Sequence, residues 1–434
     1  MEPWLSRAAR VHPDRAALVT PARTWTYREL NDSARAVAGA LRASGVGHGD
    51  RVALALPSEE LIVALHGCLA IGAAAVPVDL RLTDAERALR LQGVTRTLTE
   101  LPDGPPAPER PLALSDVATV MYTSGTTAGP KRVELTLSNW LWNAIGSAVA
   151  LGLDPAERWL CPMPLAHVGG LSIALRSAIY GTTLLLHERF ETDRVRDALL
   201  DGAERVTLVS LVPTMLGRLL DAGLRQPPAL RRVLLGGGPI PPALLARAGE
   251  AAIPVSPSFG MTETCSQIAT DGFPLLGAEL ALSDAGELLV RGPSVAAGAI
   301  SGDGWLHTGD LGRFDEAGRL EIVGRTAETI VTGGENVAPT EIEAVLLEHD
   351  AVSDAAVIGR PDPEWGEAVV ALIVPRLGWV HGHPHGTALD GALAEDLRGF
   401  CAARLAPFKV PKRFELVETL PRSVTGKLQR RQLR

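Results

Sequence analysis

The sequence is poor in cysteine and has no excess of positive charge, and each shortage argues against a class of protein. Its four cysteines (Cys68, Cys161, Cys265 and Cys401) are scattered and form no CxxC pair. We therefore expect reduced core thiols in a cytosolic protein rather than a disulfide framework. The formal net charge is −8 at pH 7. This balance argues against a nucleic-acid footprint and against a polybasic membrane anchor.

Long hydrophobic segments are also scarce. The start of the chain, Met1–Trp4, lacks the basic and apolar regions of a signal peptide. Residues 61–78 carry no Asp, Glu, Lys or Arg and are long enough to span a membrane. They also contain histidine, glycine and proline, so we interpret them as a buried helix followed by a strand at Ala75–Val78. We predict a cytoplasmic protein with no stable membrane insertion and no nucleic-acid partner.

The chain is long enough for two or three domains. It has 434 residues, of which 46% are hydrophobic, so a large core is available. Helix and strand patterns alternate through Leu91, which predicts a parallel sheet covered on both faces. Thr26 and Glu29 could form a capping box at the start of a helix through Leu41, and residues 137–151 are also predicted to be helical. From Gly286 the pattern changes to short strands with Asp-Gly turns, and the last hundred or so residues have an α+β rhythm. The predicted fold class is α/β, with a large N-terminal domain of mostly parallel sheets flanked by helices, a small β-rich subdomain and a small α+β C-terminal domain.

One stretch has the composition of a phosphate-binding loop. A predicted strand at 117–122 is followed by Thr123-Ser124-Gly125-Thr126-Thr127-Ala128-Gly129-Pro130-Lys131. Glycines let backbone N–H groups approach an anion, hydroxyls add donors, and the lysine adds a positive charge. The spacing differs from G-x-x-x-x-G-K-[ST], and an isolated turn of this composition is as often only a turn.

Further motifs follow in a fixed order. They are Ser258-Phe259-Gly260-Met261-Thr262-Glu263-Thr264, Gly304-Trp305-Leu306-His307-Thr308-Gly309-Asp310, Gly324-Arg325, Gly333-Gly334-Glu335-Asn336 and Leu420-Pro421-Arg422-Ser423-Val424-Thr425-Gly426-Lys427. Together with the phosphate stretch they resemble the core motifs of the adenylate-forming superfamily, which contains acyl-CoA synthetases, peptide-synthetase adenylation domains and luciferases. The resemblance extends from about Trp25 to the last residue.

A narrower resemblance comes from two of these segments and from the short chain. Leu235–Ile240 and Ser258–Ile268 are similar to the o-succinylbenzoate–CoA ligase family of menaquinone biosynthesis. The implied reaction has two halves. A carboxylate attacks the α-phosphate of ATP to give an acyl-adenylate and pyrophosphate, and the thiol of coenzyme A then displaces AMP.

The resemblance implies a set of nucleotide-binding residues. The phosphates of ATP would lie against Thr123, Ser124, Gly125, Thr126, Thr127 and Lys131. The adenine would lie between Gly236, Gly237 and Gly238 on one side and Ser258, Phe259 and Gly260 on the other. The family usually has tyrosine where Phe259 stands, so one phenolic hydrogen bond is missing here.

The resemblance also implies the residues closest to the chemistry. Thr262 would contact the α-phosphate, and Glu263 would bind Mg²⁺ as a hard oxygen ligand. Asp310 would accept hydrogen bonds from the ribose hydroxyls, with Arg325 beside it. Lys427 would contact the substrate carboxylate and the α-phosphate. His167 would form part of the acyl pocket, although a lone histidine in an apolar segment is usually a core residue.

The resemblance further implies three parts with different roles. Residues 1–324 would form the N-terminal domain that binds ATP and the acid, 325–328 a hinge, and 329–434 a mobile C-terminal domain. Gly333 and Gly334 would line the path of the coenzyme A arm, because glycine lets the arm pass close to the backbone. Many relatives carry Asp or Lys where this chain has Ala327, so the hinge behaviour can differ.

Several alternatives stay open at this point. The acid could be another aryl or medium-chain acid, the acceptor could be a carrier protein, or the chain could bind nucleotide without catalysis. The intact set of Lys131, Glu263 and Lys427 argues against the last of these. The loop with His381, His383 and His385 is interpreted as a solvated loop rather than a metal site. The oligomeric state is not indicated, and a homo-oligomer is one alternative.

Overall fold

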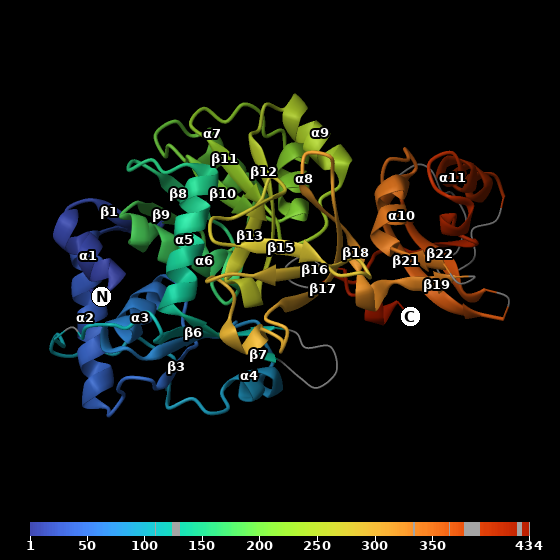
Figure 1. Ribbon diagram of the computed structural model, residues 1–434. Helices are drawn as coiled ribbons and strands as arrows, with labels where there is room; N and C mark the ends of the chain where they lie inside the picture. The colour runs from blue at the N-terminus through green and yellow to red at the C-terminus, as the bar shows by residue number, and fades with distance from the viewer. Residues whose placement is uncertain are drawn as a thin grey trace.

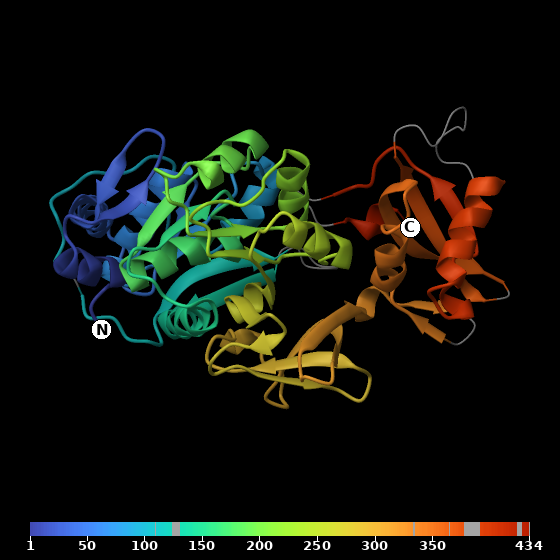
Figure 2. The same cartoon turned by 90° about the horizontal axis from the view of Figure 1, so that it is seen from above.

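Two lobes are visible in the computed structural model, which describes residues 1–108, 110–123, 131–332, 335–363, 365–376, 391–422 and 428–433. The blue to yellow part of the chain forms the large lobe, and the orange to red part forms the small one (Figures 1 and 2). The large lobe contains two mostly parallel sheets and a small antiparallel sheet, and the small lobe is built on a sheet of its own. This arrangement confirms the predicted fold class.

The first sheet carries the predicted phosphate stretch at its edge. Its strand order is β5-β3-β4-β6-β7, parallel except for β7. The strands are β3 (Arg51–Leu54), β4 (Ala74–Pro77), β5 (Arg96–Leu98), β6 (Val117–Thr123) and β7 (Lys131–Thr136). Since β6 is a central strand and β7 its antiparallel neighbour, the chain turns back on itself at the phosphate stretch.

The second sheet has more strands than the first, and its strands lead into the predicted adenine-binding segments. Its order is β14-β13-β12-β11-β10-β8-β9-β1-β2, with parallel pairing from β12 to β1. The strands are β1 (Ala16–Val19), β2 (Thr24–Thr26), β8 (Arg158–Cys161), β9 (Thr183–Leu186), β10 (Leu208–Leu211), β11 (Arg232–Leu235), β12 (Val255–Met261), β13 (Ser266–Thr270) and β14 (Phe273–Pro274). The carboxyl ends of neighbouring parallel strands are the usual place for ligands in such sheets.

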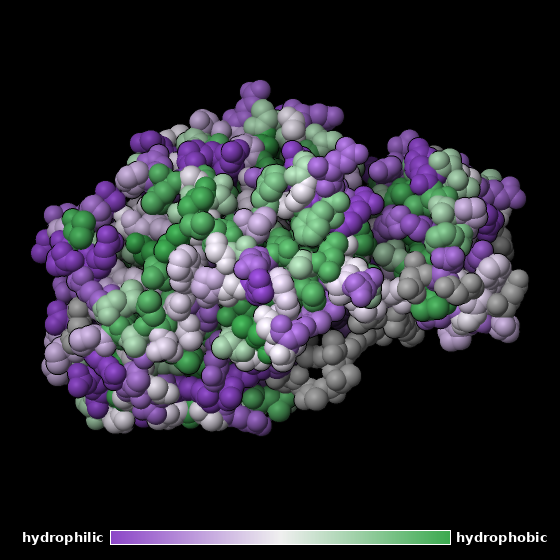
Figure 3. Space-filling view, in the orientation of Figure 1, coloured by the Kyte–Doolittle hydropathy of each residue, from purple (hydrophilic) through white to green (hydrophobic). Residues whose placement is uncertain are grey.

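Helices cover these sheets and bury their apolar sides. They are α1 (Trp4–Val11), α2 (Tyr27–Ala43), α3 (Ser58–Ile71), α4 (Asp84–Arg90), α5 (Leu137–Leu151), α6 (Val168–Tyr180), α7 (Thr192–Leu200), α8 (Pro213–Asp221) and α9 (Pro242–Glu250). The predicted capping box of Thr26 and Glu29 is present at the start of α2. The predicted helix over 137–151 is confirmed as α5, whose outer surface exposes Trp142 and Val149. Apolar patches on this face of the molecule are green in Figure 3.

A small antiparallel sheet completes the large lobe. Its order is β15-β16-β17-β18, formed by β15 (Glu279–Leu282), β16 (Glu287–Arg291), β17 (Leu306–Phe314) and β18 (Leu320–Arg325). Single 3₁₀ turns flank it: η1 (Thr262–Thr264), η2 (Ala297–Ala299) and η3 (Thr326–Glu328). The predicted β-rich subdomain is thereby confirmed.

The small lobe has a separate hydrophobic core under its own sheet. The order is β20-β19-β22-β21, with β23 added parallel to β22. Its elements are β19 (Ile330–Thr332), β20 (Glu335–Val337), α10 (Pro339–Leu346), β21 (Val352–Asp362), β22 (Gly366–Pro375), α11 (Ala392–Ala402), η4 (Pro407–Lys409), β23 (Arg413–Leu416) and η5 (Arg430–Gln432). Ile342, Val357 and Phe414 are among the residues buried in this core.

Two predictions about the interior are confirmed. The uncharged segment 61–78 lies within a buried helix, α3, and a buried strand, β4, rather than a membrane span. Among the described residues, no helix combines the length and apolar character that crossing a membrane requires. All four cysteines lie in the described part of the chain, where they are buried and form no disulfide.

Candidate active site

The predicted phosphate stretch connects two paired strands. β6 ends at Thr123 and β7 begins at Lys131, and these two residues are cross-strand partners. The intervening residues 124–130 lie outside the described part of the chain. Their predicted contacts, through Ser124, Gly125, Thr126 and Thr127, therefore stay a prediction. The pairing fixes both ends of the loop, so Lys131 stands at the start of the return strand.

Lys131 faces the acidic residue of the second motif. Its Nζ lies 3.9 Å from Oε1 of Glu263, with the lysine side chain 57% exposed and the glutamate 15% exposed. An ion pair this long and this exposed is weak, because water screens it. The ammonium can therefore turn toward a bound anion at little cost.

The turn that carries Thr262 and Glu263 is held by one hydrogen bond to a side chain and one between backbone groups. The hydroxyl of Thr264 accepts a hydrogen bond from the N–H of Met261 at 3.0 Å. The carbonyl of Glu263 accepts one from the N–H of Ala296 at 2.8 Å. Immediately after the turn, Cys265 has a φ of 60°. A left-handed conformation in a non-glycine residue is uncommon, and such strain concentrates at functional sites.

The predicted adenine-binding segments lie side by side. β11 and β12 are parallel neighbours, so Gly236–Gly238 follows β11 next to Ser258 of β12. A Cβ on Gly236 would lie 2.5 Å from Ser258 Oγ and 2.9 Å from the Ser258 carbonyl oxygen. The Ser258 hydroxyl in turn donates to the Leu235 carbonyl at 3.1 Å. Glycine is required at 236 because the two segments approach so closely.

Gly260 is required for a similar reason. β12 and β13 change register between Phe259 and Gly260, and a Cβ on Gly260 would lie 1.8 Å from the Ser266 carbonyl oxygen. Phe259 is half-buried and packs against the core cluster that contains Ile268 and Leu288. Its stacking on adenine stays a prediction.

Asp310 and Arg325 form a two-point ion pair between neighbouring strands. The two residues are cross-strand partners in β17 and β18. Nε of Arg325 donates to Oδ1 of Asp310 at 2.7 Å, and Nη2 donates to Oδ2 at 3.3 Å. The aspartate side chain is only 6% exposed. A carboxylate held at two points has a fixed orientation, which suits the recognition of a pair of hydroxyls.

Arg325 also connects this pair to the Lys131–Glu263 pair. Burial lowers the pKa of Arg325, but hydrogen bonding to Asp310 and the charges of Glu328 and Glu263 outweigh it, so the pKa is raised overall. Glu263 therefore lies close enough to act on the guanidinium. Four residues from four separated motifs thus converge on one region of the large lobe: Lys131, Glu263, Asp310 and Arg325.

His167 directly precedes the first residue of α6 and lies next to an aspartate. Its Nε2 is 3.9 Å from Oδ2 of Asp79, and its side chain is 42% exposed. Asp79 also binds Arg81 through a hydrogen bond of 2.6 Å. The described contacts place His167 beside Asp79 rather than in the apolar core, and its predicted role in the acyl pocket stays a prediction.

A buried arginine that the sequence did not predict as a site residue lies behind the Thr262–Glu263 turn. Arg176 of α6 is 1% exposed, and its Nη2 donates to Oδ1 of Asn143 at 2.6 Å. The amide of Asn143 donates to the Gln267 carbonyl at 2.7 Å, on the strand after the turn. Among the described residues, Nε and Nη1 of Arg176 have no hydrogen-bond partner. Its signal in the sequence is a single charge inside the apolar helix 168–180.

The residues present fit a magnesium ion that is bound jointly with phosphates. Among the described residues, no group of three or more His, Cys, Asp or Glu side chains is arranged to hold a metal. Mg²⁺ is often bound through one or two carboxylates together with substrate phosphates and water. Glu263 supplies one such carboxylate beside Lys131, which suits a metal that arrives with its nucleotide.

Several predicted residues lie outside the described part of the chain. These are Gly333, Gly334 and Lys427, and the loop with His381, His383 and His385. No structural statement applies to them, and their predicted roles stay predictions.

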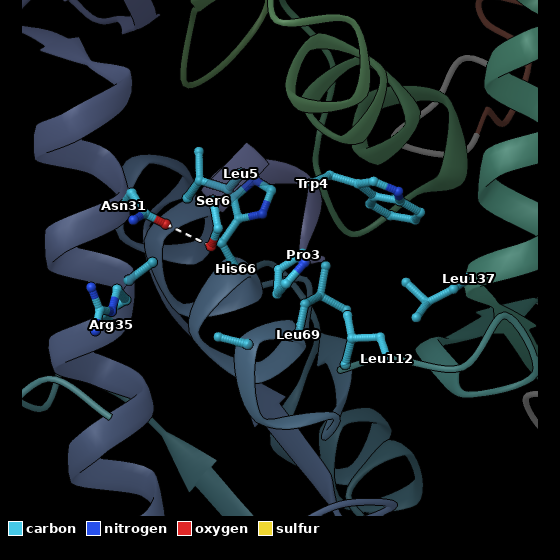
Figure 4. Close-up of a pocket in the computed structure, with 12 residues that line it drawn as sticks. Pro3, Trp4, Leu5, Ser6, Asn31, Arg35, His66, Leu69, Leu112 and Leu137 are labelled. Carbon is cyan, nitrogen blue, oxygen red and sulfur yellow. Dashed lines mark hydrogen bonds between the residues drawn. The ribbon is translucent and has the colours of Figure 1, made fainter. Parts of the chain in front are cut away.

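A small cavity lies apart from this site, beneath α1 (Figure 4). Its lining includes Trp4 and His66, and Ser6 donates to Asn31 at 3.0 Å beside it. Burial lowers the pKa of His66 to about 4, so the ring is neutral near pH 7. None of the predicted site residues lines this cavity, which belongs to the packing of the N-terminal helices.

Comparison with known proteins agrees with the convergence of these motifs. The model of the AMP-binding enzyme family matches residues 5–98 and 92–299, and that of the AMP-binding enzyme C-terminal domain matches residues 341–427. The chain belongs to the AMP-binding enzyme family. The adenylate-forming resemblance of the motifs is thereby confirmed.

The relatives share almost the whole chain. A 2-succinylbenzoate–CoA ligase from Bacillus licheniformis is 37% identical over 99% of this chain and 98% of its own. Two structures of o-succinylbenzoate CoA synthetase from Bacillus subtilis are 34% identical and cover 100% of this chain. The complex with the acyl-adenylate intermediate covers 98% of that protein with a TM-score of 0.89. The complex with ATP and magnesium covers 99% of that protein with a TM-score of 0.88.

Proposed function

We propose that this chain joins o-succinylbenzoate to coenzyme A at the expense of ATP, in menaquinone biosynthesis. The chain is an AMP-forming acid–thiol ligase that first makes an acyl-adenylate and then a thioester. The observation that carries this proposal is the convergence of Lys131, Glu263, Asp310 and Arg325. It occurs in a chain whose full-length relatives are named 2-succinylbenzoate–CoA ligase. ATP, coenzyme A and the acid are its small-molecule substrates, and Mg²⁺ is its metal.

The first half-reaction brings two anions together. A carboxylate must reach the α-phosphate of ATP, so the site has to supply positive charge and fixed orientation. Lys131 and the loop before it lie at the phosphates, and Thr262 lies at the α-phosphate. Mg²⁺, when bound with ATP through Glu263, neutralises phosphate charge. Asp310, held by Arg325, orients the ribose, and Lys427 stabilises the charge that develops at the α-phosphate.

The remaining assignments follow the division of the chain. Residues 1–324 bind ATP and the acid, with Gly236–Gly238 and Ser258–Gly260 at the adenine and His167 at the acyl pocket. Residues 325–328 form the hinge, and residues 329–434 form the mobile domain with Gly333 and Gly334 at the coenzyme A arm. We place the enzyme in the cytoplasm, where ATP and coenzyme A are available.

The acid has two carboxylates, and the second one needs a partner. Arg176 suits this role, because it is a buried cation with two N–H groups that have no partner among the described residues. Burial lowers its pKa, and its Nη2 donates to the amide oxygen of Asn143 rather than to a carboxylate. An anion that entered this region would compensate the buried charge.

The acid can be identified with a panel of substrates. Pyrophosphate release is measured with o-succinylbenzoate, with each of its two monocarboxylate analogues, and with other aryl and medium-chain acids. We expect the highest kcat/KM with o-succinylbenzoate. Arg176→Lys should lower kcat/KM for the dicarboxylate more than for the better monocarboxylate analogue. A higher kcat/KM with another acid would overturn the substrate assignment, and an equal loss with both acids would overturn the role of Arg176.

A further inference from the structure

The first half of β17 departs from regular strand pairing. β16 and β17 are antiparallel neighbours in the small sheet of the large lobe (Figure 1). Glu287 of β16 pairs with Leu311 of β17. Leu289 pairs with His307, so residues 308–310 all lie opposite a single residue of β16 and form a β-bulge. Bulges redirect side chains and are frequent beside active sites. This one ends with the predicted ribose-binding aspartate.

Two side chains bind N–H groups of this bulge. Oε1 of Glu287 accepts a hydrogen bond from the Gly309 N–H at 2.8 Å. Oγ1 of Thr308 accepts one from the Asp310 N–H at 3.1 Å and donates one to the Leu288 carbonyl at 2.8 Å. A bulge disrupts the backbone ladder, so its N–H groups need other acceptors. Glu287 and Thr308 supply these acceptors at the two last residues of the bulge.

Glu287 is itself fixed at several points. Its N–H donates to Oγ of Ser283 at 3.1 Å. Its Oε2 lies 3.1 Å from Nδ1 of His307, and Nε2 of that histidine lies 2.9 Å from Oδ2 of Asp303. The Glu287 side chain is 22% exposed. Because each carboxylate oxygen has its own partner, rotation of the carboxylate would break a contact, so it is a fixed acceptor for the bulge.

The carboxylate of Asp310 is held from both neighbouring strands. Gly309, directly before it, has a φ of 71°, a conformation that residues with a side chain rarely adopt. Asp310 itself is 5% exposed. Arg325 binds its carboxylate from β18, whereas Glu287 and Thr308 hold the backbone of the bulge on the side of β16. The direction in which Asp310 points therefore depends on the bulge as well as on the arginine.

We propose that Glu287 and Thr308 are positioning residues that aim Asp310 at the ribose hydroxyls of ATP. The inference rests on the proposed function, in which Asp310 accepts hydrogen bonds from those hydroxyls. It adds two residues that act through the backbone of the bulge and are not ligands of the nucleotide. Hydrogen bonds weaken steeply when they are misaligned. A displaced Asp310 therefore weakens the ribose contacts, while the contacts to the phosphates stay as they are.

The test compares ATP with 2′,3′-dideoxy-ATP, which lacks both ribose hydroxyls. Acid-dependent pyrophosphate release gives kcat/KM for each nucleotide. We expect wild type to prefer ATP about a hundredfold, as for two hydrogen bonds to a charged group. Glu287→Ala and Thr308→Val should each reduce this preference about tenfold by lowering kcat/KM for ATP. The kcat/KM for 2′,3′-dideoxy-ATP should stay within about twofold of wild type, because this nucleotide has no hydroxyl to misalign.

Two further variants serve as controls. Glu287→Gln keeps an oxygen that can accept from the Gly309 N–H and should retain most of the preference for ATP. Glu279→Ala removes a carboxylate that binds Arg291 at 2.9 Å on the same sheet, and should leave kcat/KM for both nucleotides unchanged. Thr308→Val keeps the shape of the side chain, so the test holds even if Glu287→Ala does not fold.

Three results would overturn the positioning role. They are an equal loss of kcat/KM with both nucleotides, as a merely structural role predicts, an unchanged preference in either Glu287→Ala or Thr308→Val, and a preference in Glu287→Gln as low as in Glu287→Ala. Asp310→Ala, which should abolish the preference for ATP, separates this inference from the proposed function. If wild type releases no pyrophosphate with any acid, or if Asp310→Ala keeps the preference, the underlying assignment fails and the inference with it. If only Asp310→Ala loses the preference, the positioning role alone fails.

Discussion

The ammonium of Lys131 lies 3.9 Å from the carboxylate of Glu263, although Lys131 starts a strand of the first sheet and Glu263 lies in the turn between β12 and β13 of the second. This contact brings together two motifs that are far apart in the chain. It supplies a mobile cation and a hard anionic ligand at one place, which a nucleotide bound with Mg²⁺ requires.

Lys131 should be protected by ATP from chemical modification. The sequence contains only four lysines, Lys131, Lys409, Lys412 and Lys427. The Lys131 side chain is 57% exposed, whereas Lys409 is paired with Glu341 and Lys412 lies 4.3 Å from the ring of Trp365. Acylation followed by peptide mass mapping should show that ATP with Mg²⁺ slows labelling of Lys131. The labelling of Lys409 and Lys412 should not change. Unaltered labelling of Lys131 would contradict its place at the phosphates.

Glu263→Gln should weaken the response to magnesium. The substitution keeps the size of the side chain but removes the charge of a hard oxygen ligand. We expect the Mg²⁺ concentration at half-maximal adenylate formation to rise at least about tenfold, by analogy with lost metal-site contacts. Glu134→Gln is the control, because Glu134 lies on the same strand as Lys131 and pairs with Arg51. This variant should leave the Mg²⁺ response unchanged. A normal Mg²⁺ response in Glu263→Gln would rule out the metal assignment.

Phe259→Tyr should tighten nucleotide binding slightly. The phenylalanine is half-buried on β12, where the family usually has tyrosine, and the added hydroxyl can form one hydrogen bond. One such bond contributes about 1 kcal/mol, so KM for ATP should fall by no more than about tenfold while kcat stays the same. A raised KM for ATP would indicate that the ring at this position does not face the adenine.

The start of β17, the strand that carries Asp310, should respond to pH through His307. Hydrogen bonds to Asp303, at 2.9 Å, and to Glu287, at 3.1 Å, raise the pKa of this histidine. Its stabilising contribution is fully present below the unfolded value of about 6.5 and is lost as pH rises through the folded value. Melting temperatures of wild type and His307→Gln should therefore differ more at about pH 6 than at about pH 8.5. A difference that does not change with pH would show that the charged form of His307 does not stabilise the start of this strand.

The order of the motifs predicted which residues form the site, but the sequence did not predict the contacts between those residues. The helix over 137–151, the capping box at Thr26 and the burial of segment 61–78 follow local rules of periodicity and capping, so they were predictable. The close approach of Gly236 to Ser258 depends on the pairing of two strands, which local pattern does not specify. Only the three-dimensional structure could supply it.

The missed residues share a common reason. Arg176 and Arg430 bind partners that lie far away in the sequence, Asn143 for the first and Glu328 and Glu343 for the second. A basic tail such as that around Arg430 is usually interpreted as a solvated surface, and burial alone distinguishes it. Charged residues that are buried by tertiary contacts are therefore the part of this protein that sequence reasoning could not reach.

Isotope exchange between pyrophosphate and ATP, measured without coenzyme A, tests the central claim most directly. A site that joins a carboxylate to the α-phosphate before any thiol binds must catalyse this exchange whenever its acid is present. We predict exchange that requires o-succinylbenzoate and Mg²⁺, proceeds without coenzyme A and is lost in Lys427→Ala. Exchange that is absent without coenzyme A, or that proceeds without any acid, would contradict the account.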